Sequence, residues 1–295
     1  MRNIDLDTLE IFQSVVACGG ISHAARTLHR VPSNITTRIK QLEARLGVTL
    51  FHRQGRGLRL TQEGEVLLGY AERLLRLANE AEATLKTRRP QGTFRLGSLE
   101  SAAGARLPPI LARYHQDNPS VRVELLTAPT SALVSHLLNH DIEAAVVSQP
   151  FTAPGLERQA LFEEELVLIS ARGHAPVRSP RDLGRTTLIA FAHGCSYRKR
   201  LEDWLATDAI LPERVLEFAS YPAIVACVAA GSGVALVPRS VLASLRATDD
   251  VMTHPLPAVL ARNLTHLLWH PGTPSIAFAR FRALLPTLEA VPALG

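Results

Sequence analysis

The chain of 295 residues is too long for one typical hydrophobic core and predicts two or three domains. Its composition, with 46% hydrophobic and 20% charged residues, is typical of a globular protein, and no run approaches the roughly 18 to 20 apolar residues of a membrane span. The first 60 residues hold nine bases and four acids, which accounts for the whole net charge of +5, so we expect a polyanion partner for this segment.

Three helices and a hairpin are expected at the start of the chain. Apolar residues at helical spacing predict helices over 6–16, 22–28 and 32–46. Two short strands over 49–53 and 58–61 follow, joined by a glycine-rich turn. The third helix has its core face at Ile35, Ile39, Leu42 and Leu46. Three helices followed by a basic hairpin predict a winged helix-turn-helix.

A long linker helix is expected over 61–88. Its apolar residues recur at alternating steps of four and three, at Leu67, Ala71, Leu74, Ala78, Ala81 and Leu85. This heptad pattern favours a seam that pairs with a second copy, and a single amphipathic helix packed on its own domain is the alternative. Because Arg89–Gly92 would end the helix, we expect domains over 1–60, 61–90 and 91–295.

The remainder alternates between strands and helices, which predicts a parallel α/β domain of two lobes. Strands are expected over 93–98, 121–127, 143–147, 166–170, 187–191, 215–218, 233–237 and 264–269. Helices are expected over 102–116, 131–139, 196–206, 222–230, 239–245 and 275–290. We expect lobe I to comprise 91–162 with 268–295, and lobe II to comprise 163–267.

The second helix of a helix-turn-helix enters the major groove with its N-terminal residues at base edges. Because Ile35 and Ile39 face the core, the polar residues of helix 32–46 remain for the outer face, and arginines of the hairpin suit phosphates or the minor groove. The candidate DNA-binding residues are Pro32, Ser33, Asn34, Thr36, Thr37, Arg38, Lys40, Arg53 and Arg56. A small helical domain with an ordinary polar surface is the alternative.

Residues 1–65 resemble the LysR-type transcriptional regulators. The matching segments are Leu9–Phe12, Gly20–Ser22, Ala24–His29, Leu42–Glu43, Leu46–Arg53 and Leu60–Gly64. The resemblance extends over the rest of the chain. It implies a double-stranded DNA operator, a homodimer formed through the linker helix, assembly into a tetramer, and RNA polymerase as a further partner. It also implies a periplasmic-binding-protein-like C-terminal domain that holds a small-molecule inducer between its lobes.

The family's DNA contacts correspond to Pro32, Ser33, Thr36, Thr37 and Arg53 in this chain. The family often has glutamine where Pro32 stands and arginine where Thr37 stands, so these departures bear on the operator sequence. A closer likeness, to regulators of putrescine utilisation within the family, is carried by His29–Arg38, Pro90–Gly92, Leu96–Ser101 and Cys195–Arg198.

Three loops of the α/β domain form the candidate effector site, because ligands bind beyond the carboxyl ends of strands, near helix N-termini. The candidate residues are Ser98, Leu99, Glu100, Ser101, Thr127, Thr130, His193, Cys195 and Ser196. Serine and threonine at helix starts have an alternative role as N-caps. Helix N-termini favour a carboxylate ligand, whereas an inward-pointing Glu100 favours an amine, and the sequence leaves both open.

Enzyme signatures are missing: the chain has no phosphate-binding loop, no nucleotide-binding glycine fingerprint after a strand and no hydrolase or metalloprotease motif. We therefore expect no enzyme activity, no cofactor and no metal. The start of the chain lacks an export signal and the three cysteines are scattered, which favours a cytoplasmic protein. Two alternatives remain, a redox-sensing regulator acting through Cys195 and an enzyme or solute-binding protein with an accessory N-terminal domain.

Overall fold

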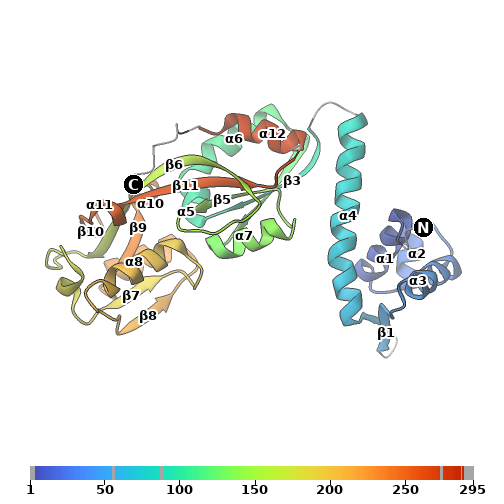
Figure 1. The fold of residues 1–295 in the computed structure, drawn as a ribbon, viewed down its shortest axis with the longest axis horizontal. Helices are drawn as coiled ribbons and strands as arrows, with labels where there is room; N and C mark the ends of the chain where they lie inside the picture. Colours follow the sequence, from blue (N-terminus) through green and yellow to red (C-terminus); the bar gives the residue numbers. More distant parts are fainter. Residues whose placement is uncertain (1–3, 55–56, 87–89, 273–274, 287, 289–295) are drawn as a thin grey trace. The chain divides into compact units, whose positions relative to one another are not determined.

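The computed structural model describes residues 4–54, 57–86, 90–272, 275–286 and 288. The chain divides into two compact units, Met1–Arg88 and Arg89–Gly295 (Figure 1). Within the part of the chain that is described, no helix is long and apolar enough to cross a membrane.

The N-terminal unit contains the predicted three helices, hairpin and long helix. The elements are α1 (Leu6–Ala17), α2 (Ile21–Thr27), α3 (Pro32–Leu46), β1 (Phe51–Gln54), β2 (Gly57–Leu60) and α4 (Gln62–Lys86). Asp5 caps α1 by accepting a hydrogen bond from the Thr8 backbone N–H at 2.9 Å, and Gly47 ends α3 in the left-handed region at φ 71°. The predicted winged helix-turn-helix is confirmed.

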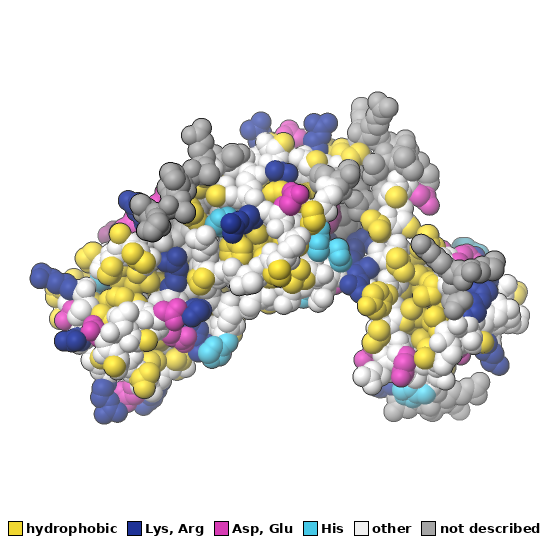
Figure 2. All heavy atoms as spheres, in the orientation of Figure 1, with side chains coloured by type: hydrophobic (Ala, Val, Ile, Leu, Met, Phe, Trp, Pro, Cys, Tyr) yellow, Lys and Arg dark blue, Asp and Glu magenta, His cyan; other side chains and the backbone are white. Residues whose placement is uncertain are grey.

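Helix α4 corrects the first two positions of the expected heptad seam. Leu67 and Ala71, its first two positions, are buried in the core of their own unit together with Phe12 and Leu42. The large apolar side chains that α4 exposes are Val66, Tyr70, Leu74 and Leu77, which we call the α4 apolar face; Leu74 is also the third position of the expected seam. Figure 2 shows hydrophobic side chains gathered at the surface along this helix. Packing within the N-terminal unit, which includes contacts between α1 and α4, explains the first two positions of the apolar repeat.

The C-terminal unit is built on one large mixed sheet. Its strand order is β10-β6-β11-β5-β3-β4, with β9 paired to β6, and β7 and β8 form a separate parallel pair. The strands are β3 (Gly92–Ser98), β4 (Val121–Thr127), β5 (Ala144–Ser148), β6 (Glu157–Ala171), β7 (Thr187–Ala190), β8 (Arg214–Glu217), β9 (Ala235–Pro238), β10 (Val251–His254) and β11 (Arg262–Trp269). Only the pairs β3–β4, β3–β5 and β7–β8 are parallel among the described strands, so the expected parallel α/β domain has a mixed sheet instead.

Helices cover this sheet on both sides; α6 and α12 lie on one face and α7 on the other (Figure 1). The helices are α5 (Glu100–Ala105), α6 (Leu107–Asp117), α7 (Thr130–Leu138), α8 (Ser196–Ala206), α9 (Tyr221–Ala229), α10 (Arg239–Leu245), α11 (Ala258–Ala261) and α12 (Ile276–Leu284), with a 3-10 turn over Pro180–Leu183. The helix expected over 102–116 is two helices. The chain breaks at Arg106 because Pro108 and Pro109 lack the N–H groups that would bond to the carbonyls of Gly104 and Ala105, so they fit only in the first turn of α6.

Two separate hydrophobic cores define two lobes. The core of lobe I includes Phe94, Tyr114 and Phe281, whereas the core of lobe II includes Leu168 and Trp204. Strands β6 and β11 run through both lobes as a long antiparallel pair, whose register shifts between Thr265 and His266 (Figure 1). The sequence predicted only the apolar end of β6, because its first half carries mostly charged and polar residues.

Candidate functional site

Helix α3 presents a polar face opposite its core face. Its N-terminus follows extended Val31 and has Pro32 in the first turn, where the missing N–H costs no hydrogen bond. Ile35, Ile39 and Leu42 are buried. The side chains exposed on the other side are Pro32, Ser33, Asn34, Thr37 and Lys40. Gln41 is exposed one turn beyond Thr37; the sequence analysis missed it, although i, i+4 spacing would have found it.

Two of the candidate DNA-binding residues have partners within the chain. The Thr36 hydroxyl donates to the Pro32 carbonyl oxygen at 2.9 Å. Arg38 forms an ion pair with Asp7 of α1 at 2.9 Å, and Arg30 pairs with the other oxygen of the same carboxylate at 2.7 Å. The Arg38 guanidinium therefore ties α3 to α1 in this structure, so a contact with DNA would require Asp7 to release it or share it.

The hairpin is fixed to the end of α3. The Glu43 carboxylate accepts hydrogen bonds from the backbone N–H groups of Leu50 and Phe51, at 2.7 and 3.3 Å. In the hairpin His52 pairs with Arg59, and both side chains are exposed. Arg53 belongs to β1 but its side chain is outside the described set, and Arg56 lies outside the described residues. The hairpin thus presents at least one arginine beside α3.

A cavity of about 330 Å³ lies between the two lobes. Lobe I lines it with Leu99, Glu100, Ser101, Thr127, Ala128 and Pro129 from the loops after β3 and β4. Lobe II lines it with Phe191, Ala192, Cys195, Tyr197, Glu217, Phe218, Ala219 and Tyr221. Its volume is in the range of small-molecule sites. We call it the interlobe pocket.

The nine predicted effector residues do not all meet in this pocket. Leu99, Glu100, Ser101, Thr127 and Cys195 line it. Thr130, His193 and Ser196 line a second cavity of about 510 Å³, which shares Cys195 as a wall. Ser98 lines neither cavity; it is buried, and its hydroxyl donates to the Leu99 carbonyl oxygen at 2.9 Å.

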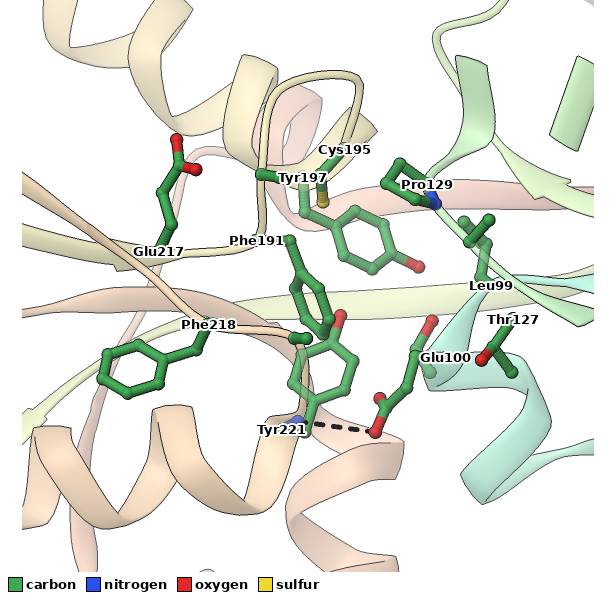
Figure 3. A pocket seen from close by; sticks show the side chains of 14 residues that line it. Leu99, Glu100, Thr127, Pro129, Phe191, Cys195, Tyr197, Glu217, Phe218 and Tyr221 are labelled. Carbon is green, nitrogen blue, oxygen red and sulfur yellow. Dashed lines mark hydrogen bonds between the residues drawn. The ribbon is translucent and has the colours of Figure 1, made fainter. Parts of the chain in front are cut away.

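The sequence analysis missed the aromatic wall of the interlobe pocket. The rings of Phe191, Tyr197 and Tyr221 lie together on one side of the pocket in Figure 3, and Phe191 meets Tyr221 edge-to-face with 4.9 Å between centroids. Burial raises the pKa of Tyr197 to about 12. The hydroxyls of Ser101 and Ser148 lie near enough to lower that pKa somewhat, yet among the described residues none makes a hydrogen bond of good geometry to the Tyr197 Oη.

Glu100 carries an acidic group into the same pocket. Its Oε1 accepts a hydrogen bond from the Tyr221 backbone N–H at 3.4 Å, drawn as the dashed line in Figure 3. Burial of the carboxylate raises the pKa of Glu100, and this hydrogen bond only partly opposes the rise. Glu217 lies on the other side of the pocket (Figure 3) and is paired with the buried Arg198 at 2.5 Å.

The Cys195 thiol is poorly suited to sensing oxidants. It is buried, and that burial raises the pKa of the Cys195 thiol. The thiolate is the form that oxidants attack, so a raised pKa disfavours the redox alternative. Among the described residues all three cysteines are free, and no cluster of three or more candidate metal ligands occurs there.

The lobes are joined beside the pocket by an ion pair. Arg106, between α5 and α6, donates to both oxygens of Glu164 on β6, at 2.7 and 3.0 Å. Ser240 of α10 donates to the same carboxylate at 2.7 Å. The Glu164 side chain is only 5% exposed, so the hydrogen bonds from Arg106 and Ser240 replace those that water would make with an exposed carboxylate.

A helix-turn-helix unit followed by a two-lobed unit with a pocket between its lobes is the architecture of a ligand-responsive DNA-binding regulator. Comparison with known families agrees. Residues 6–65 match the family described as "Bacterial regulatory helix-turn-helix protein, lysR family", and residues 87–288 match "LysR substrate binding domain". The chain belongs to the LysR family of transcriptional regulators, which are regulators and not enzymes.

Curated relatives cover most of the chain. It is 36% identical over 252 residues to the transcriptional regulator GltR of Bacillus subtilis (strain 168), which covers 85% of each chain. It is 40% identical over 250 residues to the regulator YofA of Bacillus velezensis, covering 84% of this chain and 86% of the relative. These names give no support to the likeness with regulators of putrescine utilisation.

Solved structures share the fold. Full-length CbnR in complex with its target DNA covers 96% of this chain and 99% of its own, with a TM-score of 0.69 and 24% identity. A full-length OxyR variant from Pseudomonas aeruginosa covers 96% of this chain and 93% of its own, with a TM-score of 0.67 and 20% identity. The predicted fold class, a winged helix-turn-helix, a linker helix and a two-lobed α/β domain, is confirmed.

Proposed function

We propose that this regulator binds a double-stranded operator through α3 and the hairpin, and that a small molecule in the interlobe pocket changes this binding. The observation that carries the proposal is the pocket itself, a cavity of about 330 Å³ with walls from both lobes. A ligand that touches both lobes stabilises the arrangement in which the walls meet, so it shifts the population of lobe positions. Shape change of this kind is a common route of regulation.

The DNA-binding surface we propose is the exposed face of α3. Ser33, Asn34 and Thr37 offer short donors and acceptors for base edges, and a threonine methyl can contact a thymine methyl. Lys40 and Arg59 are exposed cations suited to phosphates. Pro32, Thr36, Arg38, Arg53 and Arg56 remain proposed contacts.

We further propose a homodimer formed through the α4 apolar face. Val66, Tyr70, Leu74 and Leu77 follow one another at spacings of four, four and three residues, which places them on one side of the helix. Two copies paired in this way would present two α3 helices to half-sites one turn of DNA apart, or multiples of a turn. A tetramer, contact with RNA polymerase and a cytoplasmic location complete the proposal.

Binding of the full chain to DNA upstream of its own coding sequence tests the proposal, measured by fluorescence anisotropy at several salt concentrations. Arg59→Ala should make the slope of log K against log salt less negative by about 0.9 for each phosphate that Arg59 neutralises. Arg185→Ala removes an exposed arginine from the C-terminal unit and should leave the slope unchanged. Absence of salt-dependent binding to any duplex would refute the proposed function.

A further inference from the structure

The interlobe pocket has an unbalanced charge. Among the described residues that line it there are two glutamates but no lysine, arginine or histidine. Glu217 has a cationic partner, Arg198, which it shares with Glu202. Glu100 has no ion pair among the described residues, and its only hydrogen bond there is the 3.4 Å contact with the Tyr221 N–H. The pocket therefore holds one half-buried carboxylate whose charge has no counterion among the described residues.

The same contact occupies one of the groups that would attract an anion. The N-termini of α5, α8 and α9 reach this pocket, and free N–H groups at such ends favour a ligand carboxylate. Here the Tyr221 N–H is occupied by Glu100. A negatively charged ligand would meet the Glu100 carboxylate instead, and like charges repel strongly where water is partly excluded.

The aromatic wall adds an attraction for cations. Phe191, Tyr197 and Tyr221 line the pocket, and the faces of aromatic rings attract an ammonium group within about 6 Å. The buried Tyr197 hydroxyl can accept a hydrogen bond from such a group and has no partner of good geometry among the described residues. A volume of about 330 Å³ holds on the order of ten non-hydrogen atoms, at about 30 Å³ for each water-sized group.

We propose that the effector of the interlobe pocket is a small cationic amine with an apolar body, whose ammonium group pairs with Glu100 and whose body packs against Phe191, Tyr197 and Tyr221. This inference rests on the proposed function, since it names the ligand class of the same site. The second cavity has Arg198, Lys199 and Glu202 in its wall, and Glu202 is paired with Arg198, so this cavity is not the site of the ammonium group.

Isothermal titration calorimetry of the full chain at neutral pH tests the ligand class with three probes of similar shape. Phenethylamine is a cation, phenethyl alcohol is neutral and phenylacetate is an anion. A charged hydrogen bond to Glu100 should make the amine bind about tenfold or more tightly than the alcohol, and phenylacetate should bind most weakly. Phenylacetate binding as tightly as the amine, or no binding of the three at millimolar concentration, would overturn the proposal.

A conservative variant identifies the group responsible. Glu100→Gln keeps an oxygen that can accept the Tyr221 N–H but removes the charge, so the amine should lose about tenfold in affinity and the alcohol should bind as before. Glu213→Gln removes the same charge from an exposed site outside the pocket and should change neither. Unchanged affinity for the amine in Glu100→Gln would reject the pairing.

DNA titration of the same preparation separates this proposal from the proposed function. Suppose that the chain binds its upstream DNA, and that phenylacetate alters this binding whereas phenethylamine does not. The proposed function is then supported and the cationic amine is rejected as the ligand class. If the chain binds no duplex, the proposed function fails whatever the calorimetry shows. Both proposals are supported if phenethylamine changes the DNA affinity of the parent but not of Glu100→Gln.

Discussion

Arg106→Ala should destabilise the C-terminal unit well beyond the effect of removing a surface ion pair. The substitution leaves the buried Glu164 carboxylate with only the Ser240 hydroxyl as a partner among the described residues. Breaking a buried pair by removing one partner costs about 3 to 5 kcal/mol. Because the Arg106 side chain is 36% exposed, water solvates part of the pair and we expect the lower end, about 3 kcal/mol. For a unit of this size that corresponds to a fall in Tm of roughly 6 to 12 °C.

The assay is thermal unfolding followed by tryptophan fluorescence. The two tryptophans of the chain, Trp204 and Trp269, are both buried in the C-terminal unit, so their signal reports that unit alone. A second substitution, Glu164→Gln, removes the orphaned charge and should restore most of the stability to the Arg106→Ala variant.

The neighbouring residue on β6 supplies a matched control. Glu165 pairs with Arg239 at 2.7 Å, but both side chains are about half exposed, so Arg239→Ala should cost no more than about 1 kcal/mol. If Arg106→Ala lowers the Tm no further than Arg239→Ala, burial of Glu164 does not set the cost and the reasoning is refuted.

Three other substitutions test other parts of the structure. Gly64→Ala would press a Cβ into the Leu50 carbonyl oxygen, closer than van der Waals contact allows, so we expect weakened DNA binding with an unchanged tryptophan transition. Leu77→Glu puts a charge on the α4 apolar face and should raise the dimer dissociation constant at least about tenfold, measured by analytical ultracentrifugation. Without ligand, Glu100→Gln should match the parent in stability below pH 4.5 and should exceed it increasingly as the pH rises through the raised pKa of Glu100. The reason is that the folded parent then carries a poorly solvated charge. The measurement is the denaturant midpoint of both proteins against pH, and midpoints that do not diverge would contradict the prediction.

Local signals explain why the N-terminal unit was predicted well. The bounds of α3 follow from Pro32 at its start, Gly47 at its end and the i, i+4 spacing of Ile35 and Ile39, all of which act within a few residues. The heptad of α4 shows the limit of such reasoning. Leu67 and Ala71 satisfy a pairing seam and a core equally well, and only the position of α1 decides between them.

Local signals in the sequence also predicted part of the interlobe pocket. The rule that ligands lie beyond strand ends pointed correctly to Glu100 and Thr127, since both follow parallel strands that the pattern identified. Tyr197 and Tyr221 sit on helices whose apolar faces look like ordinary core, so a sequence cannot tell a pocket wall from packing. Their convergence with Phe191 depends on how lobe II folds, which is a non-local property.

The paired strands β6 and β11 constrain how this domain can respond to a ligand. An antiparallel ribbon is stiff along its length because its ladder of hydrogen bonds would have to break for the strands to slide. It is compliant in torsion, particularly where an irregularity such as the one between Thr265 and His266 interrupts the ladder. The lobes can therefore rotate relative to each other about the long axis of the ribbon without moving apart. A ligand that contacts both walls of the interlobe pocket would favour one angle of this rotation.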